Sequence, residues 1–241
     1  VIAEISLRVL GVGYGNSPLE RSTKYHHLHP SNYNYLIHDP NGEYGGHHVF
    51  YDNLGFRVLN KLSQTSDLAN KKNALIFLGD SFTNCNGLSE VDTWPTLVSG
   101  MLNKKFESRV NLDFQKSVAT QENTRGVLER LQRDILFANP DIITIQYGTN
   151  DSTYLLSNRG APLVSQEAFR ANLVELVDKC RLFDIKILVF LTNHPVALER
   201  YDINGFSPDE NTKIYDQIVR EVASTSACHL ADVRKAMESY S

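Results

Sequence analysis

Residues 76–83 read IFLGDSFT, and residues 146–151 read QYGTND. In each run an apolar stretch of strand length ends and a polar loop begins. Ligands of open α/β sheets bind in the loops that follow the carboxyl ends of the strands. Ser81 and Asn150 stand in such loops. They are therefore candidates for a nucleophile and an oxyanion donor that act on one carbonyl group.

An alternation of strand and helix patterns starts at Ala74. Short apolar runs, typical of buried parallel strands, predict strands at Ala74–Leu78, Val110–Phe114, Ile142–Tyr147, Lys186–Leu191 and Cys228–Val233. Apolar residues at helical spacing predict helices at about Thr93–Lys105, Asn123–Phe137, Ser165–Phe183 and Pro208–Ser224. The strand at 110–114 alternates apolar and polar residues, which suits an edge position. The pattern predicts an α/β fold, a three-layer α/β/α sandwich around a five-stranded parallel sheet.

Residues 1–73 differ from the domain expected at 74–241. They are rich in Tyr, His, Asn, Gly and Pro and lack sustained periodicity. We predict an irregular N-terminal extension that packs against the domain, because aromatic side chains favour burial. We further hypothesise that it folds over the carboxyl edge of the sheet and shapes a substrate pocket.

Composition narrows the function classes. The 241 residues, 41% of them hydrophobic, suffice for one large core. A net charge of −4 provides no basic field for nucleic acid. The three cysteines form no C-x-x-C pair, so free thiols are predicted. No apolar run is long enough to cross a bilayer. His26 and His29 have the spacing of a ligand pair but complete no metal signature, so a packed loop is predicted and no metal or cofactor is expected.

Each motif alone has a plain structural explanation. Asp80, Ser81 or Thr83 can cap a helix, and Gly-Thr-Asn-Asp is rich in turn formers. Together the motifs are more specific, and the chain resembles the SGNH (GDSL-type) hydrolase family. Residues 79–83 (GDSFT) match its first block and residues 148–151 (GTND) its third. Residues 53–57 (NLGFR) are similar to the segment before the core in bacterial members with an N-terminal membrane anchor.

This resemblance implies a flavodoxin-like fold with Ser81 as the nucleophile and Asn150 as an oxyanion donor. The glycine of the second block, whose N–H joins the oxyanion hole, is replaced by Thr120. Family members carry Asp-x-x-His after the fifth strand, but none of the eight histidines follows an aspartate at that spacing. Three explanations stay open. The base lies beyond Ser241, or His194 after the fourth strand serves instead, or the site has lost its base.

The resemblance implies a serine esterase that hydrolyses a carboxylic ester through an acyl-enzyme on Ser81, without a cofactor. O-acetyl groups on cell-surface carbohydrate are one substrate class that it suggests. It also suggests an extracytoplasmic location, with membrane contact only through an anchor upstream of Val1. The alternative is a catalytically inactive module that binds glycan or a protein partner. No pattern indicates an oligomeric state.

Overall fold

The computed structural model describes residues 19–23, 26–37, 41, 46–60, 74–106, 113–118, 121–155, 158–197, 201–202 and 205–240. Its centre is a sheet of five parallel strands in the order β10-β9-β8-β6-β7. The strands are β6 (Ala74–Gly79), β7 (Asp113–Val118), β8 (Ile142–Gln146), β9 (Ile187–Leu191) and β10 (His229–Ala231).

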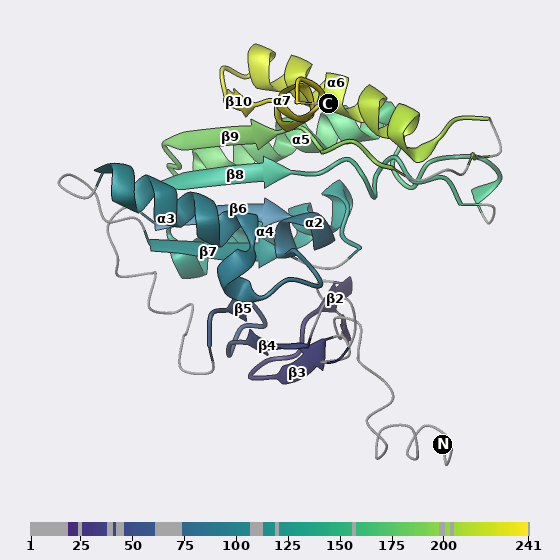
Figure 1. Cartoon of the computed structure of the whole chain (residues 1–241). Helices are drawn as coiled ribbons and strands as arrows, with labels where there is room; N and C mark the ends of the chain where they lie inside the picture. Colours follow the sequence, from purple (N-terminus) through teal and green to yellow (C-terminus); the bar gives the residue numbers. More distant parts are fainter. Residues whose placement is uncertain are drawn as a thin grey trace.

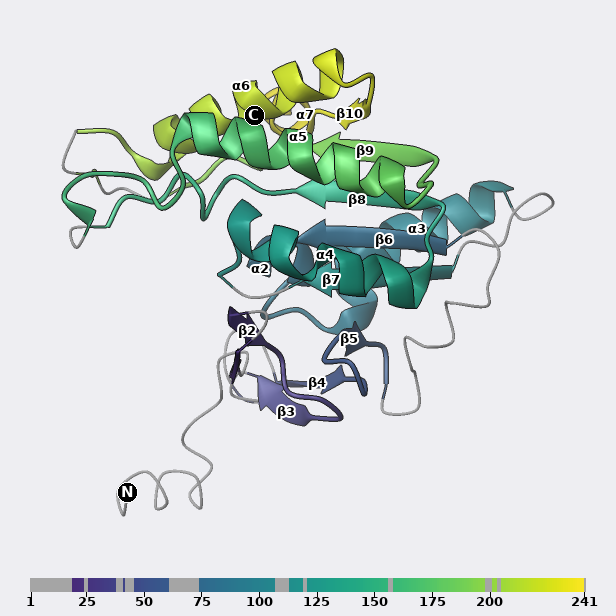
Figure 2. The same cartoon turned by 180° about the vertical axis from the view of Figure 1, so that it is seen from behind.

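Helices cover both faces of this sheet. Figure 1 shows α3 in front of it, and Figure 2 shows α4 and α5 on the opposite face. The longer helices are α3 (Trp94–Phe106), α4 (Thr124–Ala138), α5 (Gln166–Leu182) and α6 (Pro208–Thr225). The predicted three-layer sandwich is confirmed, and the strand order is the flavodoxin-like one.

The core explains why the central strands read as continuous apolar runs. All six residues of β6 are buried. Its Ile76 and Leu78 pack in one cluster with Ile143 and Ile145 of β8 and with Leu173 of α5. Strands that are buried on both faces need no polar alternation.

Capping side chains set the start of α6, which lies beside the candidate site. Ser207 Oγ accepts a hydrogen bond from Glu210 N at 3.2 Å, and Glu210 Oε2 accepts one from Ser207 N at 2.7 Å. This capping box satisfies two N–H groups that the helix itself leaves unpaired. Pro208 at the first helical position adds a suitable φ angle.

The predicted strand at Val110–Phe114 is displaced. The structure has β7 at Asp113–Val118, and residues 107–112 lie outside the described ranges. Lys116 of β7 is 1% exposed, which is rare for a lysine. Its Nζ lies 2.5 Å from Glu90 Oε2, in the short 3-10 helix η2 (Glu90–Asp92). The expected edge position is confirmed, because β7 ends the sheet order.

The described part of the extension contains short strands, which differs from the irregular segment that we predicted. β1 (Glu20–Ser22) pairs with β2 (His26–Leu28), and β3 (Asn34–Ile37), β4 (His47–Tyr51) and β5 (Arg57–Val58) form a three-stranded antiparallel sheet. These strands are too short to show a period in the sequence. His29 is packed, since its ring stacks on Tyr51 with 4.5 Å between centroids.

Arg57 anchors the three-stranded sheet beside β7 (Figure 1). Its guanidinium is buried and donates to the carbonyl oxygens of Asn84 and Leu88, both at 2.6 Å. It also forms an ion pair with Glu90, at 2.8 Å from Nε to Oε2. Asn84 ends helix α2 (Ser81–Asn84), which carries the candidate nucleophile, and Leu88 lies in the loop that follows this helix. The extension therefore supports the serine loop from the side.

The turn before Arg57 explains why residues 53–57 need a glycine. Gly55 has a φ of +80°, and a Cβ built on it would lie 2.4 Å from the carbonyl oxygen of His29. Asp52 Oδ1 accepts hydrogen bonds from Leu54 N and Phe56 N, both at 2.9 Å. The turn thus directs Arg57 toward the core domain.

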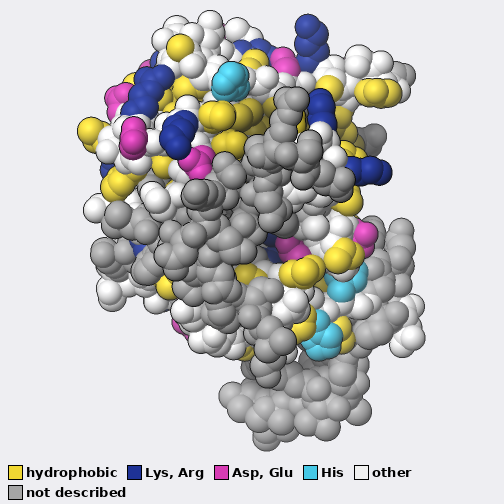
Figure 3. All heavy atoms as spheres, turned by 90° about the vertical axis from the view of Figure 1, so that its left-hand side faces the viewer, with side chains coloured by type: hydrophobic (Ala, Val, Ile, Leu, Met, Phe, Trp, Pro, Cys, Tyr) yellow, Lys and Arg dark blue, Asp and Glu magenta, His cyan; other side chains and the backbone are white. Residues whose placement is uncertain are grey.

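Figure 3 views the molecule from the amino ends of the parallel strands. On the described part of this face, basic and acidic side chains lie among hydrophobic ones. The three cysteines are free thiols, as the sequence predicted, with Cys180 buried and Cys85 and Cys228 half-buried. No helix in the described ranges has both the length and the apolar character needed to cross a bilayer.

We predict that Arg57→Met destabilises the protein by about 3 kcal/mol, because it leaves Glu90 and buried carbonyl oxygens with fewer partners. The measurement is the free energy of unfolding in urea. Arg125→Met, at an exposed position of α4, is the control and is expected to change stability by less than about 0.5 kcal/mol. An equal effect of the two substitutions would contradict the anchoring role.

Candidate active site

Ser81 lies where β6 gives way to helix α2. Asp80 caps this helix, and its Oδ1 accepts a hydrogen bond from Phe82 N at 2.9 Å. Ser81 is the first helical residue and is half-buried. Its N–H is one of those that a helix leaves unpaired at its start. The hydroxyl and a free N–H therefore occur together at the carboxyl end of the sheet.

Asn150 follows the neighbouring strand. Gly148, which begins this loop, has a φ of +133°, and a Cβ there would lie 2.8 Å from Asn193 Nδ2. Only glycine is suited to this conformation and this close approach. The sharp turn leaves Asn150 half-buried at the same edge of the sheet as Ser81.

The two loops converge, as the sequence predicted. Gly79 and Gln146 are partners in the β6–β8 register, so the chain leaves both strands side by side. Asn150 Nδ2 donates to Asp80 Oδ2 at 3.2 Å, directly beside Ser81. It also donates to the carbonyl oxygen of Glu122 at 2.8 Å. The bond to Glu122 fixes the amide, while the longer bond to Asp80 points the amide toward the serine loop.

Thr120, the third predicted oxyanion donor, lies outside the described residues. The chain that follows it does reach the site, since Glu122 accepts the hydrogen bond from Asn150. The side chain of Asn150 thus connects the loops that follow β6, β7 and β8.

Three acids lie buried beneath these loops. Asp80, Glu122 and Asp151 are 1%, 3% and 0% exposed. Burial raises the pKa of Asp80 to about 7, against the opposing hydrogen bond from Phe82 N. Burial also raises the pKa of Asp151 to about 6, against hydrogen bonds from Thr124. Raised carboxyl pKa values of this kind gather at functional sites.

Among the described residues, Glu122 pairs with a cation, and no ion pair joins Asp80 or Asp151 to one. Its Oε1 accepts from Arg130 Nε at 2.6 Å, and its Oε2 accepts from Tyr147 Oη at 2.8 Å. Arg130 also pairs with Asp134 on the same helix. This pairing holds Glu122 in place, and with it the carbonyl that orients Asn150.

His194, the candidate base within the chain, packs against Phe82, the residue that follows the serine. Its ring meets the ring of Phe82 edge-on, with 4.3 Å between centroids. Burial lowers the pKa of His194, and the positive charge of Arg234 adds to this shift. The imidazole is therefore neutral at neutral pH, which is the form that a general base requires.

A cavity of about 370 Å³ lies next to the residues that follow Ser81 and precede Asn150. Phe82 and Thr149, the neighbours of Ser81 and Asn150, both line it. Its other described lining residues lie at 152–155, at 196, and at 201–212 around the start of α6. All of these described lining residues belong to the core domain. Much of the extension lies outside the described residues, so the hypothesis that it shapes a substrate pocket stays a prediction.

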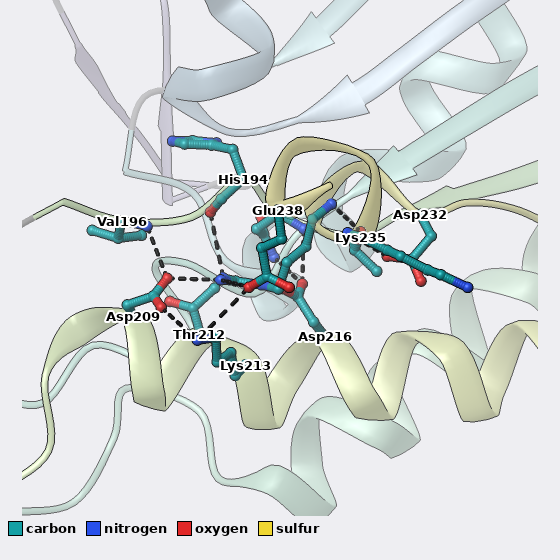
Figure 4. A network of polar contacts seen from close by, with 12 residues as sticks. His194, Val196, Asp209, Thr212, Lys213, Asp216, Asp232, Lys235 and Glu238 are labelled. Atoms are coloured by element: carbon teal, nitrogen blue, oxygen red, sulfur yellow. Dashed lines mark hydrogen bonds and ion pairs between the residues drawn. The ribbon is translucent and has the colours of Figure 1, made fainter. Parts of the chain in front are cut away.

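A buried arginine holds helix α6, whose first turns line this cavity. Arg234 of α7 (Val233–Glu238) is 2% exposed. Its Nε lies 2.5 Å from Asp216 Oδ2, and its Nη1 lies 2.7 Å from Asp209 Oδ1. Figure 4 shows these contacts, with the main-chain oxygen of His194 as a further acceptor at 3.4 Å. Arg234 therefore links α7, α6 and the loop that carries His194.

Asp209 completes this link. Its Oδ1 also accepts a hydrogen bond from Val196 N at 2.9 Å. Burial would raise its pKa, but hydrogen bonds from Arg234, Val196 and Lys213 lower it to about 2. The carboxylate is thus charged at neutral pH. Sequence reasoning missed Glu122, Asp209 and Arg234, since a single charged residue in a helical pattern looks like a solvated one.

We predict that Asp151→Asn raises stability at about pH 8 more than at about pH 4. The pKa of Asp151 is about 6 in the folded chain against an ordinary 3.8. Its stabilising contribution is therefore complete below 3.8 and is lost as the pH rises through 6. A shift of about 2 units corresponds to about 3 kcal/mol. The free energy of unfolding in urea, measured for both proteins at both pH values, tests this prediction. If the difference in stability between the variant and the native protein did not change with pH, the result would contradict the burial of an ionising carboxyl group.

We predict that Arg234→Met costs about 3–5 kcal/mol of stability, because it leaves the buried charge of Asp216 without its cation and removes one of two cations beside the half-buried Asp209. Lys235→Met changes the next residue, which is exposed, and is expected to be nearly neutral. Thermal and urea unfolding compare the two variants. Similar small losses in both would show that the network does not hold the cavity wall.

Comparison with known proteins gives one family. The chain matches the GDSL-like Lipase/Acylhydrolase family over residues 77–241. It is also 28% identical, over 141 residues, to the uncharacterized lipoprotein YqeF of Bacillus subtilis (strain 168). That match covers 53% of this chain and 57% of the relative, so the chain spans little more than half of the relative's length.

Solved structures share the fold. LAE5, an alpha/beta hydrolase enzyme from the metagenome of Lake Arreo, Spain, is 24% identical with a TM-score of 0.58, over 70% of this chain and 80% of its own. Axe2, an acetylxylan esterase from Geobacillus stearothermophilus, is 18% identical with a TM-score of 0.56, over 70% and 80%. The family match confirms the resemblance that the motifs suggested: this protein belongs to the GDSL-like lipase/acylhydrolase family.

Proposed function

We propose that the protein is a serine esterase that hydrolyses a carboxylic ester. Ser81 Oγ attacks the acyl carbon, and the carbonyl electrons move to its oxygen. The N–H of Ser81 and Asn150 Nδ2 stabilise this oxyanion, with the N–H of Thr120 as a third donor. The alcohol leaves, and water then releases the acyl group from Ser81. The observation that carries the proposal is the 3.2 Å contact between Asn150 Nδ2 and the residue before Ser81.

Neutral donors suit this task. An amide stabilises charge as it develops in the transition state without binding the ground state tightly. Asn150 keeps its bond to the Glu122 carbonyl and exchanges only the longer bond to Asp80 for the oxyanion. The donor is thus already oriented before substrate arrives, so little reorganisation accompanies the reaction.

A base takes the serine proton, because a serine hydroxyl alone is a weak nucleophile at neutral pH. His194 is the described residue that we test for this role, since its neutral ring lies against Phe82. Loss of reactivity in His194→Gln would assign the base to His194. Retained reactivity would place the base outside the described residues.

For the substrate, we propose O-acetyl groups on cell-surface carbohydrate. Axe2, which shares the fold, is an acetylxylan esterase. For the location, we propose the extracytoplasmic side of a bacterial membrane. The similarity to a lipoprotein supports this location.

We predict that a fluorophosphonate probe labels the protein at Ser81 and that Ser81→Ala abolishes labelling. Asn150→Ala is expected to lower kcat on a small activated acetate ester by about 10²–10³-fold, the usual cost of one oxyanion donor. Asn158→Ala, at an exposed asparagine, is the control and keeps full activity. Mass spectrometry of the labelled peptide and initial rates provide the measurements. A lack of label on the native protein would refute the serine mechanism.

A further inference from the structure

We propose that Tyr147 is a positioning residue for the proposed esterase. Through the carboxylate of Glu122, its hydroxyl fixes the main-chain carbonyl that orients the amide of Asn150. Tyr147 directly follows β8 and stands three residues before Asn150. The inference rests on the proposed function for its link to catalysis, while the two hydrogen bonds that carry it are features of the fold.

The hydroxyl of Tyr147 is buried where β6 and β8 end. Tyr147 is 1% exposed, and its Oη lies 2.8 Å from Glu122 Oε2 and 3.3 Å from the carbonyl oxygen of Gly79. A hydroxyl group has one proton to donate. Because hydrogen bonds to carboxylates are shorter and stronger than those to neutral carbonyl groups, the proton goes to Glu122. Burial and the charge of Glu122 raise the pKa of Tyr147 well above its ordinary value, so this donor persists at neutral pH.

The side chain of Glu122 is held along its whole length. Its carboxylate accepts hydrogen bonds from Tyr147 Oη and from Nε and Nη2 of Arg130, with 2.6 Å between Nε and Oε1. Its stem lies against α4, where a Cβ on Gly126 would come within 3.2 Å of Glu122 Cγ. Glycine in a helix interior usually lowers stability, and here its lack of a side chain leaves room for Glu122. A side chain held in this way keeps its own main-chain carbonyl in place.

Tyr147 supplies a contact that Arg130 cannot replace. Arg130 belongs to α4, and it pairs with Asp134 of the same helix as well as with Glu122. Tyr147 instead belongs to the loop that carries Asn150. Two hydrogen bonds therefore join that loop to Glu122, one from Tyr147 to the carboxylate and one from Asn150 Nδ2 to the carbonyl oxygen at 2.8 Å. Two bonds between the same segments fix their relative orientation, whereas a single bond lets one segment turn about the other.

The test compares two tyrosines that each lose one buried hydroxyl group. Tyr147→Phe is expected to lower kcat on a small activated acetate ester by about tenfold, a part of the loss that removal of an oxyanion donor causes. KM is expected to stay nearly the same, because the misplaced amide would have acted on the transition state. Tyr215→Phe is the matched control and is expected to keep the native kcat. Tyr215 is also 1% exposed, but its hydroxyl donates to the carbonyl oxygen of Val164.

A double substitution tests whether Tyr147 acts through Asn150. If it does, Tyr147→Phe changes kcat little in a protein that already carries Asn150→Ala. A loss of about tenfold in both backgrounds would show that Tyr147 acts by another route and would overturn the inference. A native kcat in Tyr147→Phe alone would overturn it as well.

A measurement without substrate separates this inference from the proposed function. The side-chain amide of Asn150 gives a pair of signals in the proton–nitrogen NMR spectrum, which Asn150→Ala identifies by removing them. Tyr147→Phe is expected to shift this pair, and Tyr215→Phe to leave it unchanged. A shift in a protein that no fluorophosphonate labels would keep the role of Tyr147 in orienting Asn150 and reject the esterase. Labelling of Ser81 without a shift in Tyr147→Phe would keep the esterase and reject the inference.

Discussion

The side-chain amide of Asn150 connects the three loops on which the site depends. It donates to Asp80 after β6 and to the Glu122 carbonyl after β7, while Asn150 itself follows β8. The parallel sheet brings these loops to one edge, but it does not set the direction of any side chain there. The two hydrogen bonds supply that direction. Without these hydrogen bonds, the proposed roles of the Ser81 hydroxyl and the Asn150 amide at one ester carbonyl would lack an oriented donor.

The acids beneath this amide show that the site is not built for stability alone. Asp151 is fully buried, and its Oδ2 has no hydrogen-bond partner among the described residues. Burying a carboxyl group without full pairing raises its pKa and lowers stability above that pKa. In contrast, Arg130 and Arg234 each form ion pairs with two or more carboxylates. The chain therefore pairs buried charges in its framework and leaves them incompletely paired beside Ser81.

Features set by local sequence could be predicted. Apolar runs and capping residues located β6, β8 and the helices α3 to α6 to within a few residues. The turn formers around Gly148 located the loop of Asn150, and the convergence of the two loops followed from the parallel sheet. Sequence matching placed Thr120, but that residue lies outside the described ranges, so its place in the oxyanion hole remains a prediction.

Features set by distant partners could not be predicted. The β7 strand was displaced in our prediction because Lys116 is compatible with burial only through Glu90, 26 positions away in the chain. Strand β5 of the extension contains Arg57, whose partners Asn84, Leu88 and Glu90 lie about 30 positions further along the chain. Likewise, nothing near Arg234 in the sequence indicates that Asp209 and Asp216 surround it. In each case a charge looks exposed until the fold supplies its partner.

The most direct test of the central claim is a crystal structure of the protein after reaction with a phosphonate ester. The account predicts a covalent bond at Ser81 Oγ and a phosphonyl oxygen about 3 Å from Asn150 Nδ2, a normal hydrogen-bond distance. It also predicts that Asn150 keeps its bond to Glu122 and gives up the bond to Asp80. An adduct whose oxygen points away from Asn150, with the bond to Asp80 intact, would contradict the shared role of the two loops.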